Sequence, residues 1–113
     1  MLNKNSHLKL IDTTLGMNYT YAIEELWLNP YNYLMMAKNT KTSLNEYITD
    51  PYLNKEINSK YEELQYELSK LDATYKETLK NSTYTTIVAD NELFKFLEKY
   101  NIEVISLEAN IPN

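Results

Sequence analysis

The sequence predicts an α/β fold in which short strands accompany one long helix. Apolar residues recur every three or four positions between 57 and 79, which is the period of a helix with one apolar face. An Asn-Pro pair at 29–30 and an Asp-Pro pair at 50–51 are typical of helix starts. Residues 84–107 contain two β-branched runs separated by a helical pattern, which indicates a strand, a helix and a second strand.

The first part of the chain predicts one short strand. Leu8, Leu10 and Ile11 are the apolar residues of this strand, and Gly16, the only glycine, closes the turn that follows it. Residues 17–23 fit either a strand or an irregular segment.

Two helices in succession are predicted next. The first runs from about Pro30 to Tyr47, and residues 48–49 make the corner into the second. The second covers residues 50–80 and is about 45 Å long at about 1.5 Å per residue. We expect Leu68 and Leu71, in the middle of its apolar stripe, to be buried. The stripe consists of Ile57, Tyr61, Leu64, Leu68, Leu71, Tyr75 and Leu79.

The last part of the chain predicts a βαβ unit. Residues 84–89 are β-branched and apolar and indicate a buried strand, residues 91–100 have helical spacing, and residues 103–107 alternate as a second strand. Asn101 occupies the usual helix-stop position. Strands joined in this way are expected to be parallel.

Composition excludes several functions. The net charge of −5, from 16 acidic against 11 basic residues, argues against nucleic acid as a partner. Without cysteine the chain offers no thiolate metal site and no lipid-attachment cysteine. Lys9 and Asp12 interrupt the first apolar cluster, so we expect no signal peptide in this chain. We predict that the protein is not an enzyme, because nucleophile–base pairs and phosphate-binding glycine loops are missing from the sequence.

Four pieces of the sequence occur in the order and spacing of a known family. They are E-L-W-L-N-P at 25–30, D-P at 50–51, Leu68 with Leu71 and Asp72, and residues 87–100. Together they resemble the middle portion of the zinc- and manganese-binding solute-binding proteins of ABC importers.

The resemblance implies that this chain is a fragment of a two-lobed α/β solute-binding protein. Residues 1–49 would end the first lobe with a helix after Pro30, residues 50–81 would form the long backbone helix, and residues 82–113 would begin the second lobe as a βαβ unit. It also implies a periplasmic or membrane-associated, extracytoplasmic location. The implied partners are a metal ion and the membrane permease of the importer, and cell adhesion is an associated role.

The resemblance also implies metal ligands. The histidine of the family's Pro-His-x-Trp motif corresponds to Glu25, and its proline corresponds to Glu24. A further ligand corresponds to Asp90 in an ungapped alignment, or to Asn91 if residues 94–96 are matched to a Phe-Lys-Tyr found in some members. We expect the family's first and last ligands to have no counterpart here.

Each candidate ligand also has a structural alternative. Asp90 precedes a predicted helix, where Asp is a preferred N-cap, and Glu25 is equally a solvated acid on a loop. With so few ligands, Mn or Zn would bind weakly, and hard oxygen donors favour manganese, calcium or magnesium over zinc.

We therefore interpret the chain as a truncated or degenerate metal-binding component of an ABC importer, with weak or lost metal binding. The alternative is a structural or interaction module that retains the scaffold without binding a ligand. Sheets with few strands expose unpaired edges, and the apolar stripe of the long helix would be only partly covered. For these reasons we also predict a homodimer.

Overall fold

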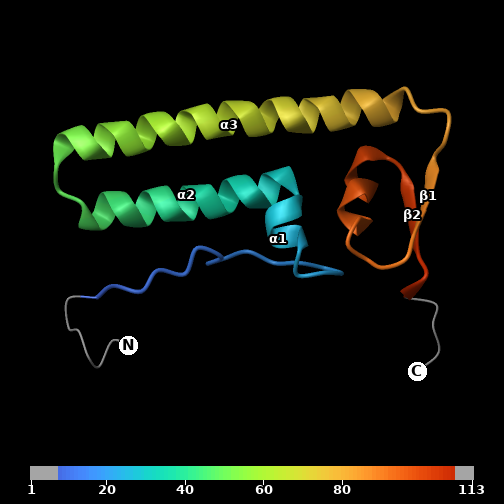
Figure 1. Ribbon diagram of the computed structural model, residues 1–113, viewed down its shortest axis with the longest axis horizontal. Coiled ribbons are helices and arrows are strands. Elements are labelled where there is room, and N and C mark those ends of the chain that lie inside the picture. The colour runs from blue at the N-terminus through green and yellow to red at the C-terminus, as the bar shows by residue number, and fades with distance from the viewer. Residues whose placement is uncertain (1–7, 109–113) are drawn as a thin grey trace.

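The computed structural model describes residues 8–108, in which a pair of long helices lies beside a small unit with two strands (Figure 1). Residues 1–7 and 109–113, the outer ends of the first and third predicted segments, lie outside the described range. The elements are α1 (Glu25–Leu28), α2 (Pro30–Tyr47), α3 (Pro51–Lys80), β1 (Thr86–Ala89), the 3₁₀ helix η2 (Lys95–Tyr100) and β2 (Glu103–Ser106).

The two long helices begin at the predicted Asx-Pro pairs. The Asn29 side chain accepts a hydrogen bond of 3.0 Å from the Tyr31 amide, and the Asp50 side chain accepts one of 2.9 Å from the Tyr52 amide. Each proline occupies the first turn, where its missing N–H costs nothing. The predicted extents of both helices are confirmed, and α2 and α3 run antiparallel as a hairpin (Figure 1).

The expectation that Leu68 and Leu71 are both buried is not met, since Leu68 is half-buried and Leu71 is exposed. No residue of α3 is fully buried, and Leu71 is 43% exposed, whereas Asp72 is half-buried. At 3.6 residues per turn, positions 71 and 72 lie about 50° to either side of the line through Leu68 and Tyr75. The C-terminal unit packs on the side of Asp72, which is why the aspartate and not the leucine faces inward.

The C-terminal unit, formed by β1, η2 and β2, contains the predicted parallel strand pair. Thr86 is paired with Glu103 and Ala89 with Ser106, and Asn101 adopts the left-handed conformation (φ 66°) expected of a stop residue. The connecting helix differs from the prediction because it is a 3₁₀ helix that begins only at Lys95. At six residues it is longer than most 3₁₀ helices, because runs beyond three or four residues are uncommon.

Of the two strands in the C-terminal unit, only β2 contains buried residues. In β2, Val104 and Ser106 are almost fully buried, whereas Val88 of β1 is 62% exposed. The predicted buried strand at 84–89 is therefore shorter and half-exposed, because among the described residues no element covers its outer face. Apart from Pro30 at the start of α2, the buried apolar residues come from α1 and the C-terminal unit and are Leu26, Tyr100, Ile102 and Val104.

The N-terminal segment does not form the predicted strand. Residues 8–12 run irregularly beside α2 (Figure 1), because no strand in the described part of the chain pairs with them. The predicted turn at Gly16 is present, with φ 77° at the glycine. Asn39 of α2 ties this turn down by donating to the Thr13 and Leu15 carbonyls at 2.9 and 3.1 Å. Residues 17–23, for which strand and irregular structure were both open, are irregular.

None of the helices within residues 8–108 is both long enough and apolar enough to cross a membrane.

Candidate functional site

An open cleft of about 470 Å³ lies between the segment that precedes α1 and the C-terminal unit. One wall contains residues that follow β1, and Glu108 follows β2, so the cleft lies at the carboxyl ends of two parallel strands. Ligands of α/β proteins commonly bind at this edge of the sheet. The lining residues are Tyr21, Ala22, Glu24, Asn91, Glu92, Leu93 and Glu108.

The first predicted ligand, Glu25, is a buried structural carboxylate. Only 7% of the residue is exposed, so the alternative of a solvated loop acid is wrong. Its Oε2 accepts from the Thr20 amide at 3.2 Å, and its Oε1 accepts from the Tyr21 and Ala22 amides at 3.0 and 3.3 Å. A carboxylate has about four acceptor positions, so three of them already bind backbone in this structure. Glu25 thereby fixes residues 20–22, of which Tyr21 and Ala22 line the cleft.

The second predicted ligand is either Asp90 or Asn91, and the structure places these two neighbours differently. Asp90 is exposed and is not among the residues that line the cleft, and its backbone carbonyl accepts from the Glu108 amide at 3.1 Å. Asn91 does line the cleft, and its side chain accepts from the Leu93 amide at 2.9 Å. This bond is a local turn, and η2 begins only at Lys95 without a side-chain cap, so the N-cap expected at Asp90 is not formed. Asn91, the residue of the alternative alignment, therefore lines the cleft, whereas Asp90 does not.

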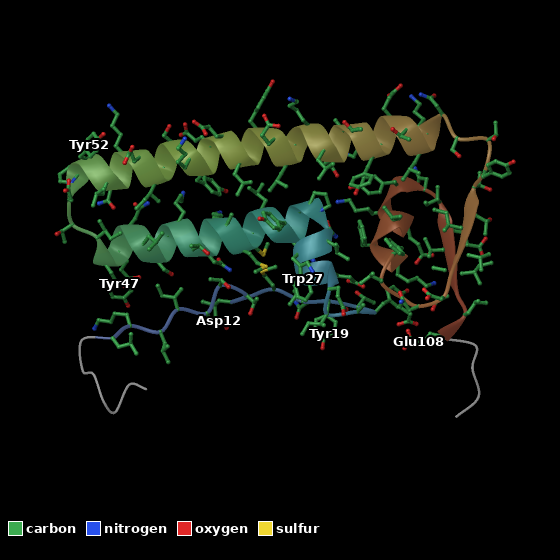
Figure 2. All side chains as sticks on the ribbon, in the orientation of Figure 1. Asp12, Tyr19, Trp27, Tyr47, Tyr52 and Glu108 are labelled. Atoms are coloured by element: carbon green, nitrogen blue, oxygen red, sulfur yellow. The ribbon has the colours of Figure 1, made fainter. Side chains whose placement is uncertain are left out.

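Three cleft carboxylates were not selected from the sequence. Glu24 and Glu92 are half-buried and Glu108 is exposed (Figure 2), and all three line the cleft. Among residues 8–108, however, no group of three or more His, Asp or Glu side chains is placed to hold a metal ion. Glu92 and Glu108 follow the two predicted strands, so the rule that ligands collect at strand ends would have found them.

A second polar cluster joins α3 to η2. The Asp72 carboxylate accepts from the Tyr100 hydroxyl at 2.7 Å and forms ion pairs with Lys76 at 3.1 Å and Lys99 at 3.4 Å. The Tyr100 hydrogen bond is the main cause that lowers the pKa of Asp72, and the two lysines add to it. Burial and then the same hydrogen bond raise the pKa of Tyr100 well above its usual value. Both groups therefore stay in their hydrogen-bonding forms at neutral pH.

Comparisons with known proteins agree on one family. The sequence model of the family described as zinc-uptake complex component A, periplasmic, matches residues 22–112. No curated protein matches the chain. Among solved structures, the chain is similar to a ZnuA crystal structure described as a 138–173 deletion mutant with zinc bound, with a TM-score of 0.73 and 18% identity.

That structural likeness covers 94% of this chain and 43% of the ZnuA chain, so the protein spans less than half the length of the solved relative. At 18% identity the likeness shows the fold, and it confirms the prediction of an α/β fragment of a solute-binding fold with a long helix and parallel strands. The family match covers most of the sequence and includes all the helices and strands described above. The chain therefore belongs to the family of periplasmic zinc-uptake components.

Proposed function

We propose that the protein takes part in the extracytoplasmic capture of a divalent metal ion for an ABC importer. The observation that supports this best is the acidic cleft at the carboxyl ends of β1 and β2 in a chain of this family. In this proposal α3 is the backbone helix of residues 50–81. It connects the end of one lobe, residues 1–49, with the start of the next, residues 82–113. The metal ion and the membrane permease are the partners.

The metal would be held weakly in a truncated or degenerate form of the family's site. Glu25 keeps about one free acceptor position, Asp90 is exposed, and Asn91 offers an amide oxygen in the cleft. These are hard oxygen donors, and Glu24, Glu92 and Glu108 add others of the same kind. Such donors favour manganese, calcium or magnesium over zinc, which prefers nitrogen and sulfur.

Thermal unfolding in the presence of Mn²⁺ or Zn²⁺ tests the proposal. A ligand that binds only the folded protein stabilises it by RT ln(1 + [L]/Kd), where [L] is the free ligand concentration, and so raises the unfolding midpoint. We expect millimolar Mn²⁺ to raise the midpoint of the parent protein and of the control Glu63→Gln, an exposed acid on α3. The rise should be smaller in Glu92→Gln. An unchanged midpoint with every metal, or a submicromolar zinc affinity, would contradict the proposed weak hard-cation site.

A second candidate function is a structural or interaction module without a ligand. The bonding of Glu25 favours it, because this carboxylate binds three backbone amides and thereby stabilises the fold. In that case metals leave the unfolding midpoint unchanged, whereas Glu25→Ala lowers it. The same unfolding experiment therefore separates the two functions.

A further inference from the structure

The C-terminal unit contacts the helical hairpin through a small number of polar side chains. Tyr100 and Lys99 of η2 both bind Asp72 of α3, at 2.7 and 3.4 Å. Lys99 also donates to Asn29 Oδ1 at 3.3 Å, and the same oxygen caps the start of α2. One lysine thus links the start of α2, the C-terminal half of α3 and η2.

Apolar packing at this junction is limited. The aromatic contact between Tyr75 and Tyr100, with ring centroids 5.4 Å apart, joins α3 to η2, and no residue of α3 is fully buried. Apolar contacts are non-directional, whereas hydrogen bonds weaken steeply when donor and acceptor are misaligned. The angle between η2 and α3 therefore depends mainly on the bonds to Asp72.

We propose that Asp72, Lys99 and Tyr100 form a latch that sets the position of the C-terminal unit relative to the helical hairpin, and with it the width of the acidic cleft. The latch lies where η2 meets α3, and Figure 2 shows Glu108 at the other end of the unit, away from α3. A rotation about the latch moves Glu92 and Glu108 relative to Glu24, which is on the opposite wall.

A weaker contact near the cleft can persist during such a rotation. The Lys95 ammonium lies 5.2 Å from the centre of the Tyr21 ring, and Tyr21 is a cleft residue whose amide binds Glu25. Lys95 and Lys99 are four residues apart on η2, so the unit contacts the N-terminal half at both ends of this short helix. The cation–π contact tolerates a range of ring positions, so it guides the unit without fixing its angle.

The absence of cysteine from the sequence makes a direct measurement possible, because two introduced cysteines carry the only spin labels. Gln65→Cys on α3 and Val88→Cys on β1 place both labels at exposed positions. Electron–electron resonance then gives the distance distribution between the hairpin and the C-terminal unit. The variants are Lys99→Met, which keeps the aliphatic stem, and Tyr100→Phe, which keeps the ring. The control is Lys70→Met, whose lysine pairs within α3 with Glu67.

We expect one narrow distribution in the parent and in Lys70→Met, and a broader or displaced one in Lys99→Met and Tyr100→Phe. Circular dichroism identifies the folded samples, and Asp72→Asn serves as a milder variant that keeps the side-chain size if either of the others fails to fold. Unchanged distance distributions in the folded latch variants would overturn the latch. This holds even if the variants unfold at lower temperature, because the loss of a contact that only stabilises the fold also lowers the unfolding midpoint.

The effect of the latch on ligand affinity rests on the proposed function. If Mn²⁺ binds, we expect Lys99→Met to weaken its binding several-fold relative to Lys70→Met. If Mn²⁺ does not bind the parent but the distances broaden in the latch variants, the latch stands and the metal proposal fails. If Mn²⁺ binds the parent and Lys99→Met equally and the distances stay the same, the latch fails and the metal proposal stands.

Discussion

Glu24 and Glu25 show how two adjacent, identical residues take different roles. Neighbouring positions at the start of a helix point about 100° apart. Glu25 therefore turns inward to three backbone amides, while Glu24 lines the cleft. The sequence could indicate that a carboxylate at this position matters, but its partners are amides of residues 20–22, whose irregular path no local pattern defines. Its role depends on tertiary structure.

Replacement of Glu25 by alanine should destabilise the protein strongly. The change leaves the Thr20, Tyr21 and Ala22 amides without their acceptor, and hydrogen bonds to charged groups contribute about 1.5 to 3 kcal/mol each in favourable cases. We expect a loss of about 2 to 4 kcal/mol in the free energy of unfolding, measured by urea denaturation. Glu24→Ala is the matched control and should cost less than about 1 kcal/mol. Equal losses would show that the Glu25 carboxylate does not hold this segment.

Asp72 should make the stability of the protein sensitive to acid. The Tyr100 hydrogen bond, and then Lys76 and Lys99, hold the pKa of this carboxyl below its usual range. Its stabilising effect is fully present above the pKa of an unfolded aspartate, about 3.9, and is lost as the pH falls through the lower pKa of the folded state. Between about pH 5 and pH 2, the parent should therefore lose stability more steeply than Asp72→Asn. Asp90→Asn, at an exposed aspartate, should keep the parental slope in the same pH series.

The helices show which features of an element are encoded locally. The starts of α2 and α3 were predicted correctly because Asn29-Pro30 and Asp50-Pro51 act through bonds within one turn. The 3₁₀ form of η2 was not predicted, because a few apolar residues at helical spacing do not separate a short 3₁₀ helix from an α-helix. The prediction of a strand at residues 8–11 was wrong for a related reason. A strand forms only with a partner from elsewhere in the chain, and no local pattern shows whether that partner exists.

The inward face of α3 can be tested with two leucines of the same helix. Leu68 is half-buried, whereas Leu71 is 43% exposed. Removal of side-chain atoms costs stability in proportion to the apolar contact that is lost, so Leu68→Ala should cost about 1 to 3 kcal/mol and Leu71→Ala less than about 1 kcal/mol. Chemical denaturation of both variants measures the difference. A larger cost at Leu71 would mean that this side chain is covered in solution, for example by a second copy of the chain.

The whole molecule is much less compact than a domain of its length. Its radius of gyration is 18.4 Å, compared with about 13 Å for a compact domain of this size. Its extents of 52 × 37 × 16 Å describe a thin slab, one layer of elements deep. The sequence predicted α2, α3 and the two parallel strands in their order. It could not show how few side chains they bury, because burial depends on which elements lie on either side of the slab.

The position of the cleft also depends on tertiary structure that the sequence did not reveal. The resemblance led to Asp90 or, by an alternative alignment, to Asn91, and the rule that ligands collect at strand ends would have led to Glu92 and Glu108. The opposite wall, formed by Tyr21, Ala22 and Glu24, comes from a segment about 70 residues earlier in the chain. Its approach to the strand ends depends on the α2–α3 hairpin and the contacts of Lys95 and Lys99, which are tertiary features.

A slab of this kind exposes apolar surface that a second copy could cover. Leu53 and Leu71 of α3 and Val88 of β1 are between 43% and 62% exposed, and a two-stranded parallel sheet is normally covered on both faces. Antiparallel packing of two α3 helices about a twofold axis would bury the leucines, and exchange of C-terminal units would cover the strands. We therefore expect light scattering at micromolar concentration to give twice the monomer mass.

Leu71→Lys tests this dimer, because a charge in an apolar interface is costly to bury. The variant should scatter as a monomer, while Gln65→Lys, which introduces the same charge at another exposed position of α3, should remain dimeric. If the parent protein is a well-folded monomer, the exposed leucines need no partner copy. If Leu71→Lys stays dimeric while Val88→Lys dissociates, the C-terminal units and not the long helices form the interface. The twofold axis would then pass beside β1, where the half-exposed strand would pair or pack with its symmetry mate.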